Sequence, residues 1–303
     1  MQMSRRISLL LPTRNRPFLL KRLFRSIIDH TYDINNLEII LCLDNDDAES
    51  RSIEDYRLNI VKTIGPPGTM GEYNTRCLQA SSGDLIMLMN DDLTMCTIGW
   101  DQLIINFANR ISDGIFLAYP DDMEKANLST FPILSRKTCE ILKIPYPKEY
   151  EDTFIDDHIF DIFIRLKRLG HNRIFYLDNI KLDHRHFIND KVRPDVNYSH
   201  KNRYKDGLIF LSLRHLRQTQ AMRLLAAIKG RSMPPLSDKV EMVEPAKNLA
   251  QAFLRYSSIC LTDYGLPIFR RLRWLIRFTK YYAAMKSGMS FLRNKTYTLY
   301  GSG

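Results

Sequence analysis

Short, continuous apolar runs alternate with segments of helical hydrophobic spacing along the first two thirds of the chain. The runs lack apolar–polar alternation, which is typical of strands buried on both faces of a parallel sheet. The segments between them place apolar residues three and four positions apart, as amphipathic helices do. The pattern predicts an α/β fold, with a mostly parallel sheet and helices on both faces. The predicted strands are residues 6–12, 37–43, 59–64, 85–89, 115–119, 131–135 and 173–177, and the predicted helices are 17–30, 47–57, 71–81 and 156–169.

Beyond the last predicted strand, helical patterns take over, and the charge of the chain changes with them. Residues 211–303 contain 16 Lys and Arg against 4 Asp and Glu, whereas residues 1–210 contain 28 against 30. This division indicates a near-neutral body with a cationic attachment region, rather than a uniformly basic protein that binds nucleic acid. We therefore predict one domain of residues 1–205, followed by a helical, basic C-terminal region of residues 206–303.

Polar side chains follow three of the predicted strands at the points where those strands end. Ligands of open α/β sheets bind at the carboxyl ends of the strands, so these side chains are candidates for a binding site. Carboxylates bind Mg²⁺ or Mn²⁺, and such an ion neutralises charge on a diphosphate. The Asn-Asp-Asp run taken alone also fits a solvated turn, but three such strand ends favour a nucleotide and cation site. The residues are Pro12, Thr13 and Arg16 after the first strand, Asp44 after the second, and Asn90, Asp91 and Asp92 after the strand at 85–89.

Five segments, in order along residues 6–190, resemble the inverting glycosyltransferases of family 2, which have the Rossmann-like GT-A fold. The resemblance implies a metal-dependent enzyme that takes a sugar from a UDP-linked nucleotide sugar. It implies transfer to an acceptor hydroxyl, with Mn²⁺ or Mg²⁺ as the cofactor. If the basic C-terminal region binds a membrane, the expected acceptor is a glycan or lipid-linked glycan, in surface polysaccharide or glycolipid synthesis. The segments are Ser8–Arg16, Ile40–Asp44, Gly71–Asn74, Ala80–Asp92, and Asp156-Asp157 at the start of a helix that contains Arg165-Leu166.

The resemblance also implies roles for individual residues. Asn90 marks a departure from the family, because the usual Asp-x-Asp motif has its first aspartate at about this point. The last aspartate of that motif normally makes the direct metal bond, so the predicted metal site is retained. The predicted nucleotide-sugar contacts are Pro12, Thr13 and Arg16 beneath the base, Asp44 on the base, Asn74 and Asn90, and the predicted metal ligands are Asp91, Asp92, His184 and His186.

A carboxylate must deprotonate the acceptor hydroxyl during inverting transfer. Asp157 or Asp156 is the predicted base, and the other aspartate would cap the helix that begins there. His184 and His186 stand two positions apart and point to one face of an extended segment. The resemblance implies that a histidine here completes the metal shell or touches the diphosphate. Ordinary surface histidines are the alternative, because a two-histidine pair is weak evidence for a metal site.

Residues 268–283 place cations on one helical face and apolar side chains on the other. This is the pattern of a helix lying in an anionic membrane interface. The alternative is that the apolar stripe packs on the first domain or on a second subunit. The cations are Arg270, Arg273, Arg277 and Lys280, and the apolar residues are Ile268, Leu272, Leu275, Ile276 and Tyr282.

The remaining features concern location and rival functions. No apolar run reaches the roughly 18 residues that a membrane span needs, and five scattered cysteines without a CxxC pair favour a reducing compartment. We predict a cytoplasmic protein, peripheral on the inner face of the membrane, without a nucleic-acid partner and with oligomerisation left open. A sugar nucleotidyltransferase is one alternative, although the loop at 12–17 lacks glycine. A non-catalytic protein that binds membranes or nucleic acid is another.

Overall fold

The structure is a computed structural model that describes residues 5–124, 128–184, 203–236 and 240–287. The contacts between residues divide the chain into two compact units. The predicted domain boundary near residue 205 stays a prediction. Unit 1 holds the described residues up to Glu151, Ile155–Phe160 and the described residues from Arg173 to His184; unit 2 holds Asp152–Phe154, Asp161–Asn172 and the described residues from Arg203 onward.

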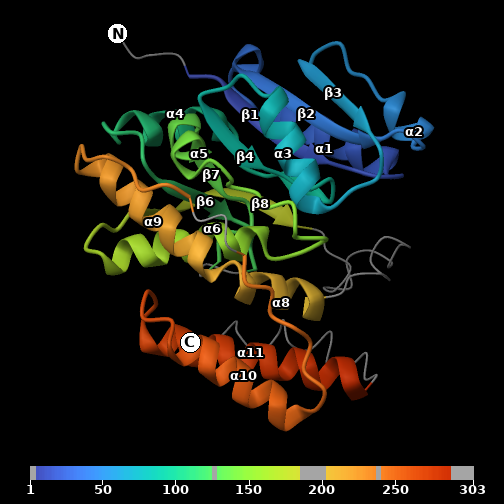
Figure 1. Cartoon of the computed structure of the whole chain (residues 1–303). Helices are drawn as coiled ribbons and strands as arrows, with labels where there is room; N and C mark the ends of the chain where they lie inside the picture. The colour runs from blue at the N-terminus through green and yellow to red at the C-terminus, as the bar shows by residue number, and fades with distance from the viewer. Residues whose placement is uncertain (1–4, 125–127, 185–202, 237–239, 288–303) are drawn as a thin grey trace. The chain divides into compact units, whose positions relative to one another are not determined.

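Unit 1 is built on a sheet that has eight strands among the described residues, in the order β3-β2-β1-β4-β7-β6-β8-β5 (Figure 1). Strand β1 is parallel to β2 and β4, β2 to β3, and β6 to β8, whereas β7 is antiparallel to both of its neighbours and β5 is antiparallel to β8. The predicted mostly parallel sheet is confirmed. The strands are β1 (Ile7–Pro12), β2 (Leu37–Asp44), β3 (Ile60–Gly65), β4 (Leu85–Leu88), β5 (Leu93–Met95), β6 (Leu117–Asp121), β7 (Ile133–Ser135) and β8 (Ile174–His184).

Helices cover both faces of this sheet, as the unbroken apolar strands predicted. Leu9 of β1 belongs to the core on one face, together with Leu23 and Phe24 of the first helix. On the other face, the thiol of Cys77 in the third helix donates to the carbonyl oxygen of Ile40 in β2 at 3.4 Å. The helices of unit 1 are α1 (Pro17–His30), the 3₁₀ turn η1 (Ile34–Asn36), α2 (Ala48–Arg51), α3 (Met70–Ala80), α4 (Trp100–Asn109) and α5 (Arg136–Leu142), and α6 (Ile155–Arg168) begins there.

The helix predicted over residues 47–57 was wrong in length, because α2 ends at Arg51. The Asp55 carboxylate accepts hydrogen bonds from the backbone N–H of Arg57 at 3.1 Å and from its guanidinium at 2.9 Å. The N–H of Leu58 then bonds to the carbonyl of Asp55 at 3.0 Å. A short acidic side chain that binds its own backbone competes with helical hydrogen bonds, so the chain turns here.

The last predicted strand, residues 173–177, was also too short, because β8 continues to His184. Its first part pairs with β6, and its last three residues pair with β5, with His184 opposite Leu93. Between these parts the register shifts, and Asp178 and Asn179 are exposed. These polar residues hide the continuing strand in the sequence, since they interrupt its apolar pattern.

A buried carboxylate, Glu38 of β2, ties the turn before β4 to the sheet. It accepts hydrogen bonds from the hydroxyl of its β1 neighbour Ser8 at 2.5 Å, from the backbone and hydroxyl of Ser82 at 2.5 and 2.8 Å, and from the N–H of Gly83 at 2.9 Å. Burial raises the pKa of Glu38, but these hydrogen bonds outweigh burial and lower the pKa below its ordinary value. A Cβ on Gly83 would lie 2.9 Å from the backbone oxygen of Arg6, so only glycine fits this turn.

Replacing Glu38 by glutamine is expected to lower the free energy of unfolding by about 1–3 kcal/mol, since buried donors lose their charged acceptor. Because the folded-state pKa is lowered, the carboxylate stabilises fully above its unfolded-state pKa of about 4.3 and progressively less as the pH falls below it. Urea unfolding at neutral and acidic pH should therefore show a difference that shrinks in acid. Glu54→Gln, at a surface pair with Lys62, is the matched control; an equal loss in both variants would contradict the prediction.

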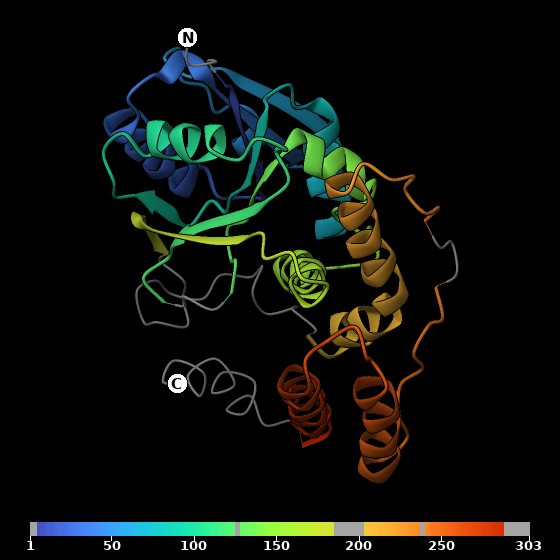
Figure 2. The same ribbon diagram turned by 90° about the vertical axis from the view of Figure 1, so that its left-hand side faces the viewer.

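Unit 2 is helical. Helix α11 buries an aromatic stripe, in which the rings of Trp274 and Phe278 stack at 5.4 Å and the ring of Phe210 lies 4.5 Å from Trp274. Helices α10 and α11 run side by side as a hairpin (Figures 1 and 2). Among the described residues, no helix is long and apolar enough to cross a membrane. The helices are the later part of α6, α8 (Arg203–Ser212), α9 (Arg214–Ile228), α10 (Leu249–Leu261) and α11 (Ile268–Ser287).

A buried ion network joins α6, α9 and the loop after α10 within unit 2. One oxygen of Asp161 accepts from the Nε of Arg165 at 2.8 Å and from the Nε of Arg217 at 2.7 Å, and all three side chains are 1% exposed. Arg165 also binds both oxygens of Asp263, at 2.8 and 2.5 Å. Burial raises the pKa of Asp161, but the two guanidinium groups outweigh burial and hold the pKa far below its ordinary value.

Candidate active site

The loops that follow β1 and β4 contact each other directly at the carboxyl edge of the sheet. Thr13 donates its hydroxyl to one oxygen of Asp91 at 2.8 Å, and Arg16 binds the other oxygen at 3.0 Å. Asp91 is 3% exposed. Burial raises the pKa of Asp91; Arg16 opposes this, and neighbouring Asp92 adds to it. Three predicted residues from two separate segments are therefore brought together, and Asp91 holds the first loop in place.

Asp92 meets His184, which β8 delivers beside β5. Their Oδ1 and Nε2 atoms lie 3.4 Å apart, both side chains are buried, and the ring of Phe131 packs edge-on against the imidazole at 5.1 Å. Burial lowers the pKa of His184, but the carboxylate of Asp92 outweighs burial and raises it, with smaller contributions from Glu124 and Asp122. Only the family resemblance predicted that Asp92 and His184 act together as metal ligands. The strand pairing that brings them together joins segments about ninety residues apart in the sequence.

The donor set at this edge fits a hard divalent ion in part. Asp92 offers a carboxylate oxygen and His184 an imidazole nitrogen, whereas both oxygens of Asp91 already accept hydrogen bonds. Within the described ranges, no three His, Cys, Asp or Glu side chains converge on one point. Mg²⁺ is commonly held by one or two carboxylates together with substrate phosphates, so two protein donors are enough for such a site. His186 lies outside the described residues.

Asp44, at the end of β2, is 1% exposed and is held by two residues for which the sequence predicted no role. Arg14 forms ion pairs with Asp44 and, at 2.8 Å, with Asp46. The hydroxyl of Tyr73 donates to Asp44 at 2.6 Å; burial and this bond raise the pKa of Tyr73 to about 12. Both lie inside the segments that carry the family resemblance, and this was the only signal that the sequence offered.

The remaining residues predicted to contact the nucleotide, Pro12, Asn90 and Asn74, differ from one another in exposure and contacts. Pro12 is half-buried at the end of β1, opposite Cys42. Asn90 is exposed at the end of β4. Asn74 is buried in α3, where its amide donates to the carbonyl of Met70 at 2.9 Å. Asn90 is thus accessible at the carboxyl edge, whereas the described contact of Asn74 lies within its own helix.

The two candidate bases stand in the first turn of α6. The Oδ1 of Asp156 accepts the backbone N–H of Asp157 at 2.9 Å, and Asp156 is half-buried while Asp157 is 7% exposed. Phe154, the residue just before α6, has a left-handed backbone with φ of 71° and provides no side-chain cap. The next residue, His158, is fully buried, with its Nδ1 at 3.0 Å from the hydroxyl of Tyr150. The side chain of Asp156 is thus engaged with the backbone of the first turn, although α6 has no side-chain cap.

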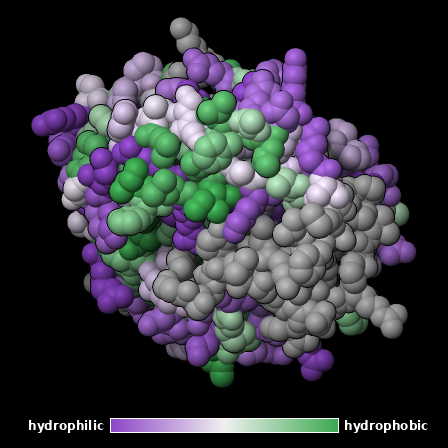
Figure 3. Space-filling view, turned by 90° about the horizontal axis from the view of Figure 1, so that it is seen from below, coloured by the Kyte–Doolittle hydropathy of each residue, from purple (hydrophilic) through white to green (hydrophobic). Residues whose placement is uncertain are grey.

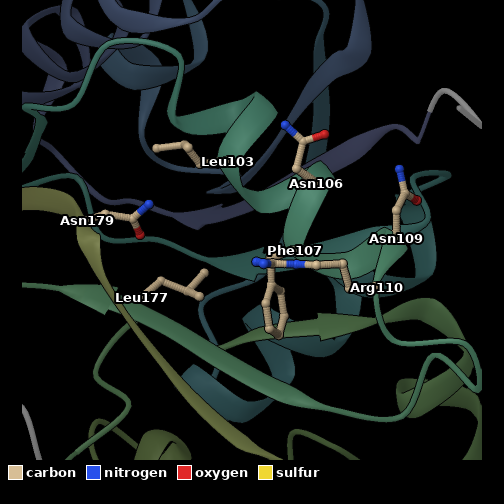
Figure 4. Close-up of a pocket in the computed structure, with 7 residues that line it drawn as sticks. All are labelled: Leu103, Asn106, Phe107, Asn109, Arg110, Leu177 and Asn179. Carbon is tan, nitrogen blue, oxygen red and sulfur yellow. The ribbon is translucent and has the colours of Figure 1, made fainter.

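A surface pocket of about 500 Å³ lies between α4 and β8 (Figure 4). Its polar lining comes from Asn106, Asn109, Arg110 and Asn179, and Phe107 and two leucines supply the apolar part. Of the predicted nucleotide, metal and base residues that the structure describes, none lines this pocket. It is therefore separate from the strand ends described above.

Comparison with known proteins gives a family and a fold. The family described as Glycosyl transferase family 2 matches residues 8–169, and no curated protein matches the sequence. Staphylococcus aureus TarS 1-349 in complex with UDP-GlcNAc is 13% identical over 93% of this chain and 92% of that chain, with a TM-score of 0.57. Another structure of TarS 1-349 is 12% identical over 94% and 92%, with a TM-score of 0.53. The mannosyltransferase PcManGT from Pyrobaculum calidifontis, in complex with GDP-Man and Mn²⁺, is 12% identical over 98% and 83%, with a TM-score of 0.47.

Proposed function

Because this chain belongs to glycosyl transferase family 2 and has the GT-A fold, we propose that it is an inverting glycosyltransferase that uses a UDP-linked sugar. Its acceptor is a hydroxyl of a glycan or lipid-linked glycan, in surface polysaccharide or glycolipid synthesis. The observation that carries the proposal is the contact of Asp91 with Thr13 and Arg16, which gathers polar residues where ligands of such sheets bind. The UDP-GlcNAc complex of TarS, which shares the fold, supports UDP as the nucleotide.

In this proposal the nucleotide lies over the ends of β1 and β2. Pro12, Thr13 and Arg16 flank the base and Asp44 accepts a hydrogen bond from it. Arg14 and the hydroxyl of Tyr73 both bind the Asp44 carboxylate, so its orientation is fixed before the donor arrives. An acceptor group that is fixed in advance costs less ordering on binding.

The proposed metal ligands are Asp92 and His184, with Asp91 and His186 as the further predicted ligands. A bound Mn²⁺ or Mg²⁺ would neutralise charge on the leaving diphosphate. Asp92 would supply a negatively charged oxygen to such an ion, and the buried imidazole of His184 beside it would supply a nitrogen. The exposed amide of Asn90 is available to donate a hydrogen bond to the donor.

Asp157 is the proposed base, because the side chain of Asp156 already binds the backbone at the start of α6. The Asp157 carboxylate takes the proton of the acceptor hydroxyl while that oxygen forms a bond to the anomeric carbon. The bond from the anomeric carbon to the diphosphate breaks at the same time, and the diphosphate leaves with the electron pair. Attack opposite the leaving group inverts the configuration at that carbon.

The donor assignment is tested with a panel of UDP-, GDP- and CDP-sugars, each with and without Mn²⁺. A UDP-sugar should raise the thermal midpoint of the protein in the presence of the metal, since a ligand that binds only the native state stabilises it by mass action. Slow release of UDP from the same sugar should accompany binding. Absence of both stabilisation and UDP release for every donor would remove the transferase assignment.

Replacing Asp157 by asparagine is expected to slow UDP release about 10²–10⁴-fold, the usual contribution of a general base. Stabilisation by UDP and Mn²⁺ should be unchanged, because the base does not hold the donor. Asp156→Asn is the matched control and should cost far less activity. If Asp156→Asn removed the activity and Asp157→Asn kept it, the two roles would be exchanged.

The proposal includes a location in the cell and a preference over two rival functions. We place the enzyme in the cytoplasm, peripherally on the inner face of the membrane, because residues 211–303 carry the excess of positive charge, with 16 Lys and Arg against 4 Asp and Glu. Family membership favours a sugar transferase over a sugar nucleotidyltransferase. The acidic residues at the strand ends disfavour nucleic acid as a ligand of unit 1, because without a bridging metal ion they would repel its phosphates.

A further inference from the structure

The α10–α11 hairpin exposes large apolar side chains that the packing of unit 2 does not use. The exposed fractions are 69% for Leu254, 72% for Tyr264 and 82% for Phe269. Figure 3 shows apolar side chains gathered with hydrophilic ones on one face of the molecule. Exposed apolar side chains gathered on one face mark an interaction site in soluble proteins. The hairpin patch, as we define it, consists of Phe253, Leu254, Leu261, Tyr264, Ile268, Phe269, Leu272 and Ile276.

The patch differs from the apolar stripe that the sequence predicted on residues 268–283. Leu275 and Tyr282 of that stripe are buried, together with Trp274 and Phe278. Phe269, which the sequence pattern did not single out, is the most exposed large apolar residue of the helix. The buried residues account for how α11 packs. The exposed apolar residues of α11 and of α10 do not take part in this packing, so any partner they have lies outside it.

Charge identifies that partner. Residues 245–287 contain eight Lys and Arg and a single acidic residue, Asp263. Asp263 is already paired with Arg165, so it offers little negative charge to a partner. A second copy of this surface would bring like charges together, which opposes association. An anionic surface that also accepts apolar side chains fits both features, and a bilayer interface with acidic headgroups is such a surface.

We propose that the α10–α11 hairpin docks on an anionic lipid bilayer through the hairpin patch, with its apolar side chains in the headgroup–acyl boundary. Arg273 lies between the patch residues Leu272 and Ile276, and Lys280 follows Ile276 by one helical turn; both are exposed on α11, and in this proposal they meet the phosphates. Each such cation near the surface contributes about 1 kcal/mol. The benefit to a lipid-linked acceptor rests on the proposed function, whereas binding to the bilayer is independent of catalysis.

The test is co-sedimentation of the full chain with vesicles of phosphatidylcholine, with and without phosphatidylglycerol. The protein should sediment with the anionic vesicles and less so at high salt, because screening weakens the attraction. Leu254→Ser with Phe269→Ser should lower binding at least about tenfold, since two large side chains no longer enter the interface. The matched control is Tyr56→Ser with Ile98→Ser, which removes exposed apolar residues of unit 1 and should bind as the wild type does.

Further outcomes separate this proposal from others. Equal sedimentation of the wild type and the hairpin variant would overturn it, as would a wild type that stays in the supernatant. A concentration-dependent dimer that only the hairpin variant loses would overturn it in favour of a second copy. Stabilisation by UDP and Mn²⁺, measured on the same samples, reports on the proposed function alone. If the protein binds UDP and Mn²⁺ but not vesicles, only the proposed membrane surface is rejected. If it binds vesicles but not UDP and Mn²⁺, only the proposed transferase function is rejected.

Discussion

Replacing Asp92 by asparagine is expected to remove the metal-dependent part of UDP binding and to lower UDP release from a UDP-sugar at least about a hundredfold. The buried carboxylate beside His184 is the best-placed anionic ligand at the sheet edge. Replacing a group that hydrogen-bonds to a metal ligand commonly lowers metal affinity or activity about 10–100-fold. Replacing the ligand itself should lower them at least as much. Thermal midpoints measured with UDP alone and with UDP and Mn²⁺ isolate the metal-dependent part.

Two other aspartates serve as comparisons. Asp29→Asn, at an exposed position of α1, should leave both the stabilisation by UDP and Mn²⁺ and the activity unchanged. Asp91→Asn should lower binding and also the free energy of unfolding without ligand, because Arg16 and Thr13 lose their charged partner. Full stabilisation of Asp92→Asn by UDP and Mn²⁺ would show that this carboxylate is not a ligand.

Replacing Asp161 by asparagine is expected to lower the free energy of unfolding by about 3–5 kcal/mol, the usual effect of removing one partner from a buried ion pair. Both Arg165 and Arg217 would keep their buried charges while losing the carboxylate between them. Unfolding in urea at neutral pH measures the difference. A change below about 1 kcal/mol, the usual contribution of a surface pair, would contradict the prediction.

The same variant carries a pH signature. The folded-state pKa of Asp161 lies below its unfolded value, so its charge stabilises fully above about pH 4 and progressively less as the pH falls below that value. The difference between wild type and Asp161→Asn should therefore shrink in acid. The matched control is Asp55→Asn, which removes the carboxylate of an exposed pair with Arg57 and should cost less than about 1 kcal/mol.

The fold and the strand-end residues were predictable because both depend on local patterns. A strand buried on both faces must be continuously apolar, and the polar residues that follow it must lie at the sheet edge. Asp44 and Asp91 were found in this way: Asp44 directly follows the apolar part of its strand, and Asp91 follows at the second position, after Asn90. The helix at residues 17–30 was also predicted with its bounds, because Pro17 favours the first turn and the spacing of its apolar residues is regular.

The partners of these residues were not predictable from the pattern. Arg14 could reach several acidic groups from its loop, and only the packing of β2 against α3 brings Tyr73 to the same carboxylate. The register of β8 beside β5 places His184 at Asp92, and exposed polar residues in the middle of β8 conceal that register. Hydrogen bonds and ion pairs between distant segments depend on angstrom-scale positions that a linear pattern does not contain.

Helix α11 shows the same division most clearly. The sequence alone determined that residues 268–283 form a basic, amphipathic helix, because helical periodicity and charge are local properties. Only the tertiary structure decided which apolar residues are used for folding: Trp274 and Phe278 are buried, and Phe269 is exposed. The sequence likewise determined that Asp91 and Asp92 end a buried strand. Only tertiary packing decided that Asp91 binds Thr13 and Arg16 and that Asp92 lies beside His184. These partners follow or belong to other strands of the sheet.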